Sequence, residues 1–181
     1  MTMHYLLTLP YLAFFALLLP RKKNFFYPLL FILAIFLNLP LFKDLSINDF
    51  TFSFIGNLSF VFLAFCTIIL LETTRDKNYF LISQKGLFFL ISINSLFFLT
   101  FLNIIPINLY YQDQHIALII ACSITIIAYF FDKILAILYL LTLFVYTIKL
   151  FDSNNILDYF FDLPSILAAL IMLFYSKIRK K

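Results

Sequence analysis

The chain has 181 residues, of which 64% are hydrophobic and 12% are charged, and its formal net charge is +4. A soluble domain is roughly 45–50% apolar and about 25% charged, so this sequence lacks the polar side chains that would cover a water-exposed surface. Composition therefore excludes a water-soluble fold. The basic residues flank apolar segments and form no stripe of their own, so we expect no nucleic-acid partner.

Seven apolar segments approach or reach the length of about 20 helical residues that crosses a hydrocarbon core. In chain order they are residues 5–20, 25–42, 50–71, 86–105, 116–131, 134–150 and 156–176. They are apolar on every side, without the alternation of a β-strand, and a helix satisfies its own backbone groups in lipid. We expect one all-α domain over residues 1–181, a polytopic integral membrane protein with about seven transmembrane helices.

The joint between the fifth and sixth segments is short, because only Asp132 and Lys133 separate them. A joint of this length is typical of a helical hairpin. A re-entrant pair that does not fully cross is the alternative. Both interpretations keep the basic C-terminal residues on the same side as the other basic loops, whereas a single merged crossing would not.

The positions of Lys and Arg predict the orientation, because cytoplasmic loops are enriched in both. With the N-terminus outside and the C-terminus inside, all 13 basic residues except Lys43 and Lys149 lie on the cytoplasmic side. No basic segment precedes the first apolar segment, so we expect an uncleaved helix there and not a signal peptide. The expected location is a bacterial plasma membrane, the inner membrane where there are two.

Asp158 and Asp162 are the main candidates for a cation, proton or substrate site, because acids within a membrane are costly and tend to be functional. If one helix contains both, they share a face, and Pro164 kinks that helix. In the alternative, Asp162 is the N-cap, Pro164 lies in the first turn, and both carboxylates are in water. A helix that begins at Leu163 is short for a crossing before it reaches Lys177, so we expect the kinked helix.

The fourth segment carries a polar face formed by Ser92, Ser95, Thr100 and Asn103, with Asn94 on the opposite side. Such a face either lines a polar pathway or supplies hydrogen bonds between helices. We assign Ser95 and Asn103 to the same candidate site as the two aspartates.

Small residues at helical spacing allow two helices to approach closely. They are Ala117, Ala121 and Ala128 in the fifth segment and Ser165 and Ala169 in the seventh. We expect both sets to be helix-packing surfaces, within the chain or against a partner.

The sequence predicts no catalytic residue, metal site or cofactor. Cys66 and Cys122 lie in apolar segments with no ligand residue nearby and are interpreted as small buried hydrophobes. The seventh segment has no Lys before Lys177 for a retinal Schiff base, and no His lies within a segment to bind haem. The H-E-x-x-H, P-loop, G-x-S-x-G and Rossmann motifs are absent from the sequence.

Three functions are compatible with these features. The expected one is a non-catalytic accessory or interaction subunit, whose partners are the bilayer and another membrane protein or a second copy of the chain. The presence of only two glycines speaks against the broken helices of transporters. The second function is a small-solute or ion transporter that uses Asp158, Asp162 and the polar face. The third is an intramembrane enzyme that acts on lipid at the outer leaflet, with Asp113 and His115 joining the two aspartates.

Overall fold

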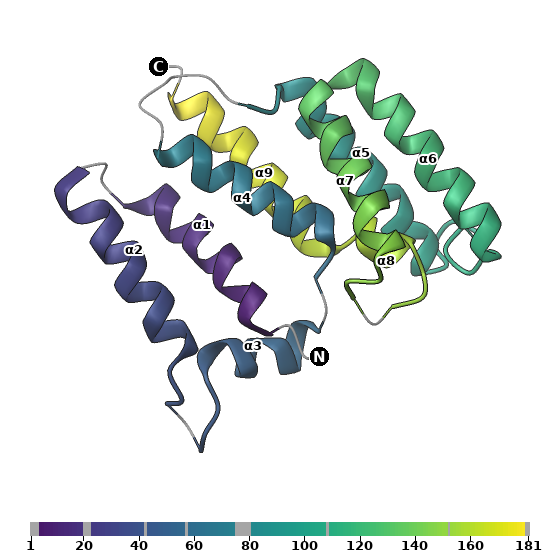
Figure 1. The fold of residues 1–181 in the computed structure, drawn as a ribbon. Coiled ribbons are helices and arrows are strands. Elements are labelled where there is room, and N and C mark those ends of the chain that lie inside the picture. Colours follow the sequence, from purple (N-terminus) through teal and green to yellow (C-terminus); the bar gives the residue numbers. More distant parts are fainter. Residues whose placement is uncertain are drawn as a thin grey trace. The chain divides into compact units, whose positions relative to one another are not determined.

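The computed structural model describes residues 4–19, 23–41, 43–56, 58–74, 81–107, 109–151 and 153–179 (Figure 1). Within these ranges the regular structure is helical, and turns and loops connect the helices. The helices are η1 (His4–Leu7), α1 (Thr8–Leu18), α2 (Lys23–Asn38), α3 (Ile47–Ile55), α4 (Phe60–Thr74), α5 (Gln84–Phe101), α6 (Gln114–Phe131), α7 (Lys133–Thr147), α8 (Leu157–Phe160) and α9 (Leu163–Arg179). The described part of the chain is thus all-α, as the composition predicts.

Several helical segments have the length and composition of membrane spans. Three are long and apolar enough to cross a membrane: Gln84–Phe101, Gln114–Phe131 and Leu157–Lys177. Four further apolar segments are shorter: His4–Leu18, Phe25–Asn38, Phe60–Thr73 and Lys133–Thr147. The chain therefore has the character of a membrane protein.

The chain divides into two compact units. The first comprises residues 1–57 and 66–77, and the second comprises residues 58–65 and 78–181. In the first unit, α1 packs against α2, and α3 packs against α2 and η1. The second unit contains the start of α4 and all of α5 to α9.

A buried amide network connects the helices of the first unit. The side-chain amide of Asn48, which is fully buried, donates to Thr8 Oγ1 at 2.8 Å and to Asn38 Oδ1 at 2.9 Å. Asn38 Nδ2 also donates to Thr8 Oγ1, at 2.9 Å. Polar atoms in apolar surroundings are costly unless they are hydrogen-bonded, so this network links α1, α2 and α3 at one point.

The second unit is built on two helix pairs. α5 packs against α9, and α6 packs against α7 as a hairpin joined through a single residue (Figure 1). Aromatic stacking holds the segment before α9: the Phe160 and Tyr139 ring centroids are 5.3 Å apart, and those of Phe161 and Phe97 are 4.0 Å apart. These contacts fix the position of Asp162, the residue that follows.

The third apolar segment, residues 50–71, is not the single helix that the sequence predicts. α3 ends immediately before Gly56, and α4 begins immediately after Ser59. Gly56 has φ 71° and ψ −150°, a conformation that is essentially restricted to glycine. Ser59 Oγ then accepts the N–H of Phe62 at 3.1 Å and caps the new helix. The chain therefore contains a broken helix although it has only two glycines.

The seventh segment, residues 156–176, is interrupted as well. α8 ends before Phe161, which is extended at φ −125° and ψ 130°, and α9 begins after Asp162. The expected kinked helix is therefore wrong, and Asp162 is the N-cap of α9 with Pro164 in its first turn. Proline suits that place, because a first-turn N–H has no partner within the helix.

Candidate functional site

Asp162 lies where the N-termini of α4 and α9 meet. Its Oδ1 accepts the backbone N–H of Ser165 at 2.9 Å, and its Oδ2 accepts the backbone N–H of Ser59 at 2.9 Å. The start of a helix carries partial positive charge, which favours a carboxylate there. Asp162 therefore serves two helices at once, and its side chain is partly buried and not simply hydrated.

A similar arrangement occurs where α5 and α7 begin. Asp132 Oδ1 accepts the N–H groups of Ile134 and Leu135 at 2.9 and 3.0 Å, and its Oδ2 accepts the N–H of Ser83 at 2.7 Å. Ser83 Oγ accepts the N–H of Gly86 at 3.2 Å and thereby caps α5. One aspartate again joins the N-termini of two helices.

We name each arrangement an aspartate clasp: an Asp that caps one helix and also accepts the backbone N–H of the Ser that caps a second helix. The 59–162 clasp joins α4 to α9, and the 83–132 clasp joins α5 to α7. The first N–H groups of a helix have no partner within it, and unpaired N–H groups are costly in lipid. The clasps therefore close helix ends that would otherwise be unfavourable in a membrane.

Gly86 permits the close approach of α5 and α7 in the 83–132 clasp. A Cβ atom at this position would lie 2.6 Å from Cβ of Asp132 and 3.0 Å from Cγ2 of Ile82. The first distance is far below ordinary van der Waals contact between carbon atoms. The absence of a side chain is therefore a steric requirement of the clasp.

Asn94 of α5 completes the surroundings of Asp162. Its Oδ1 accepts the backbone N–H of Asp162 at 3.2 Å and the hydroxyl of Ser165 at 2.8 Å, and the side chain is buried. In the sequence, Asn94 lies opposite the polar face of the fourth segment, and that position did not predict this role. A single amide on an otherwise apolar side of a helix needs a partner in lipid, and that requirement was the available signal.

The polar face of the fourth segment does not assemble around Asp162. Ser92 is exposed and Ser95 is half-buried. Thr100 Oγ1 donates to a carbonyl of its own helix, that of Phe97, at 2.8 Å. Asn103 lies beyond the end of α5, where it is exposed and has φ 59°. Among the residues that the structure describes, neither Ser95 nor Asn103 donates a hydrogen bond to the carboxylate of Asp162.

Asp158 is separated from Asp162 by the extended residue Phe161, and it has different partners. Its two carboxylate oxygens accept hydroxyl groups, one from Tyr110 and one from Ser153. Burial, followed by the hydrogen bond to Asp158, raises the pKa of Tyr110. The phenol is therefore protonated and donating at neutral pH.

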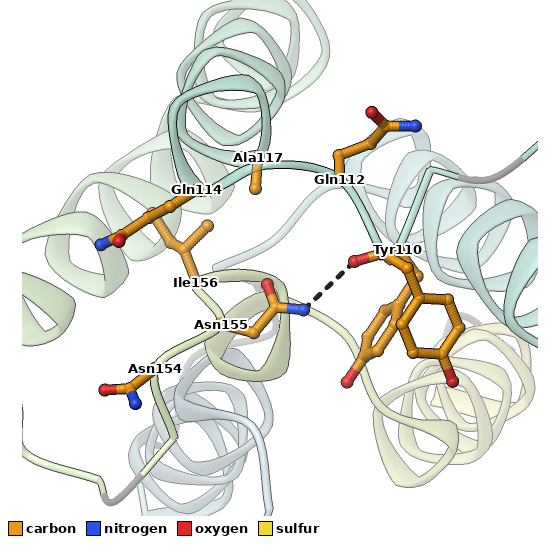
Figure 2. A pocket seen from close by; sticks show the side chains of 8 residues that line it. Tyr110, Gln112, Gln114, Ala117, Asn154, Asn155 and Ile156 are labelled. Atoms are coloured by element: carbon orange, nitrogen blue, oxygen red, sulfur yellow. Dashed lines mark hydrogen bonds between the residues drawn. The ribbon is translucent and has the colours of Figure 1, made fainter.

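A pocket of about 390 Å³ opens beside Tyr110 (Figure 2). Its lining comes from the loop before α6, the first turn of α6 and the segment before α8: Tyr110, Tyr111, Gln112, Gln114, Ala117, Asn154, Asn155 and Ile156. Figure 2 shows the side-chain amide of Asn155 directed at the carbonyl of Tyr110, a hydrogen bond of 3.2 Å. Amide groups and tyrosine rings dominate the described part of the lining, which includes no charged side chain.

The four residues of the proposed lipid-active enzyme, Asp113, His115, Asp158 and Asp162, do not share one set of hydrogen-bond partners. Asp158 is bound by hydroxyl groups, Asp162 caps helices, and Asp113 at the start of α6 makes no side-chain cap hydrogen bond. His115 is exposed on the first turn of α6. Across the residues that the structure describes, no group of three or more His, Cys, Asp or Glu side chains is placed to hold a metal ion.

The small residues that the sequence predicts as helix-packing surfaces are buried inside the second unit. Ala117, Ala121 and Ala128 of α6 and Ser165 and Ala169 of α9 each expose 1% or less of their surface. Their helices have partners within the unit, since α6 packs against α7 and α9 packs against α5. These positions are therefore closed to a partner molecule.

Comparison with known proteins gives no family to set beside this geometry. No family model matches the chain, and no curated protein and no solved structure was found to be similar to it.

Proposed function

We propose that the chain is a non-catalytic accessory protein of the bacterial plasma membrane, the inner membrane where there are two. The observation that carries the proposal is the use made of its aspartates. Both carboxylate oxygens of Asp132, Asp158 and Asp162 accept protein donors. Ion transfer or acid–base catalysis needs an oxygen within reach of the ion or proton that moves. Carboxylates bound in this way instead stabilise the helix bundle. They support a protein whose function is to bind a partner and not to transfer ions or protons.

Seven crossings, with the N-terminus outside, are the topology we propose. In its support, the three long and four shorter apolar helical segments correspond one to one with the seven apolar segments of the sequence. Local thinning of the bilayer accommodates the shorter ones. Among the described basic residues, Lys85 and Lys133 lie at the starts of α5 and α7, and Lys177 lies near the end of α9. Arg21, Lys22, Arg75, Lys77, Lys180 and Lys181 lie outside the described residues.

The partner that we propose is another membrane protein, bound through helix faces that the chain leaves uncovered. α6 offers such a face, because Ile119, Ile126 and Phe130 expose 64%, 64% and 80% of their surface.

In the native membrane we expect a complex larger than the 21.3 kDa chain. The test is nondenaturing electrophoresis after mild solubilisation, with Ile126→Arg on this face and Ile55→Arg in α3 as the matched control. A complex that survives Ile126→Arg would contradict binding through α6.

Reconstitution distinguishes this proposal from transport. Purified full-length protein is incorporated into liposomes that contain a pH-sensitive dye, and a potassium diffusion potential is imposed with valinomycin. We expect proton entry equal to that of protein-free liposomes, because Asp158 and Asp162 are engaged by protein donors. Proton or sodium flux above that background, abolished by Asp162→Asn in folded protein, would replace the accessory function with transport.

A further inference from the structure

The pocket beside Tyr110 has the size and form of a ligand site. Its volume of about 390 Å³ falls within the roughly 300–1,000 Å³ of small-molecule pockets. Ala117 and Ile156 supply an apolar floor, and both are almost completely buried. Above this floor stand two tyrosines and four side-chain amides, arranged as Figure 2 shows.

Hydrogen bonds hold one wall of this pocket in place. The hydroxyl of Tyr110 donates to Asp158, and its carbonyl accepts Asn155 Nδ2 at 3.2 Å. Asn155 Oδ1 accepts the N–H of Leu157 at 3.0 Å. The wall is therefore formed before a ligand arrives, which lowers the entropy cost of binding.

The opposite wall is held through Tyr146 of α7. Gln114 Nε2 donates to the Tyr146 hydroxyl at 2.7 Å, and that hydroxyl donates to the carbonyl of Asn154 at 3.1 Å. The side chains of Gln114 and Asn154 both line the pocket and are exposed. Both walls are thus connected to the helices that carry them.

The chemistry of the lining selects the class of ligand. An amide offers a donor and an acceptor, and so does a hydroxyl group. Tyrosine rings offer an apolar face with a polar edge. Among the residues that the structure describes, a charged ligand would meet no opposite charge in the lining and would be desolvated without compensation. Asp158 does not line the pocket, and both its oxygens are engaged by hydroxyl groups.

We propose that this pocket binds a neutral, hydroxyl-bearing ring, namely a sugar, either as a free monosaccharide or as the headgroup of a neutral glycolipid. The apolar face of the sugar ring lies on the tyrosines and the floor, and its hydroxyl groups bind the amides of Gln114 and Asn154. Such a site is independent of the proposed accessory function, because Ile119, Ile126 and Phe130, which form the proposed partner face of α6, do not line the pocket.

The test uses full-length protein in phosphatidylcholine nanodiscs, which contain no sugar. Saturation-transfer NMR is recorded with four neutral probes: methyl β-glucoside, methyl β-galactoside, methyl α-mannoside and myo-inositol. Glucosamine and glucuronate are the charged analogues of the same ring. We expect saturable binding of at least one neutral probe and weaker binding of both charged analogues. Tighter binding of a charged analogue, or no binding of any neutral probe to folded protein, would overturn the proposal.

Two further arms identify the source of the ring and its location. Nanodiscs that contain glucosyl diacylglycerol compete with the free probe if the headgroup is the ligand and leave its affinity unchanged if the sugar binds free. Asn154→Ala and Gln114→Ala should each weaken binding about tenfold, the loss of roughly one good hydrogen bond. Gln84→Ala is the matched control, because Gln84 lies at the start of α5 and does not line the pocket. This variant should leave the affinity unchanged. Equal affinity in all three variants would remove the site from this pocket.

Discussion

At the scale of single residues, polar atoms inside the bundle differ in whether they have a partner. The hydroxyl of Tyr139, in the middle of α7, is fully buried and has no hydrogen-bond partner among the described residues. A buried polar group without a partner costs about 1–3 kcal/mol of desolvation. The ring, in contrast, stacks on Phe160 and stabilises the segment that precedes α9.

We therefore expect Tyr139→Phe to raise the free energy of unfolding by about 1 kcal/mol, since it removes the hydroxyl and keeps the ring. The measurement is SDS-induced unfolding of the purified protein. Tyr159→Phe is the control with the opposite sign, because its hydroxyl donates to the Phe151 carbonyl at 2.7 Å. A decrease in stability for Tyr139→Phe would show that the hydroxyl has a partner after all.

Gly86 is sensitive for a steric reason. Gly86→Ala would place a methyl group 2.6 Å from Cβ of Asp132, and overpacking of this kind costs typically 1–3 kcal/mol. We expect a loss of that size in the same unfolding assay. Ser92→Ala, on an exposed position of α5, should change little. Unchanged stability for Gly86→Ala would mean that α5 and α7 do not approach as closely as described.

At the scale of helices, the clasps join pairs of elements that begin at the same point. Asp162→Asn and Asp132→Asn each keep the shape of the side chain but lose the charge and one acceptor oxygen. Asn can still cap its own helix, but its amide nitrogen cannot accept the N–H of Ser59 or Ser83. We expect each variant to lower the free energy of unfolding by about 1–2 kcal/mol, because that N–H loses its acceptor. Asp113→Asn is the matched control, because Asp113 occupies the N-cap position of α6 without a side-chain cap hydrogen bond. Equal effects at all three positions would show that the loss is one of charge alone.

The cap of α3 makes a prediction about pH. Hydrogen bonds from the side chain and then the backbone of Ser46 lower the pKa of Asp49, with a smaller contribution from His4. Because the pKa is lower in the folded protein, the capping bonds contribute fully above the unfolded value of about 3.9. They are lost as the pH falls through the folded value. We expect α3 amides to exchange hydrogen faster at pH 3 than at pH 6, after correction for intrinsic rates. Ser46→Ala should remove most of that difference, and an unaltered difference would assign it to another group.

The sequence predicted the helices better than their breaks. Long apolar runs such as those of α5 and α6 leave little choice of structure in lipid, so their approximate extents follow from length and hydropathy. The break at Asp162 did not follow, because an N-cap and a kink use the same Asp and Pro residues. Only the tertiary partners, Ser59 and Asn94, favour one over the other. Likewise, the pocket is formed by residues of two loops and of the first turn of α6, and no local pattern brings them together.

At the scale of the whole molecule, the proposed topology predicts which residues face each side of the membrane. With Cys66 and Cys122 replaced by alanine, we expect Ile107→Cys to react with a membrane-impermeant maleimide in intact spheroplasts. Lys177→Cys should react only after permeabilisation, because it follows the last proposed crossing. Both residues are exposed, so a failure to react reports sidedness and not burial. Labelling of Lys177→Cys in intact spheroplasts would reverse the proposed orientation.

The clasps also bear on how the protein is made. Each joins an early residue to a late one: Ser59 and Asp162 are 103 positions apart, and Ser83 and Asp132 are 49 apart. A ribosome therefore delivers α4 and α5 to the membrane before the aspartates that complete them exist. Until synthesis reaches Asp162, the nascent chain holds an open amide at the start of α4. The start of α4 is therefore fully hydrogen-bonded only once the segment that carries Asp162 has been synthesised.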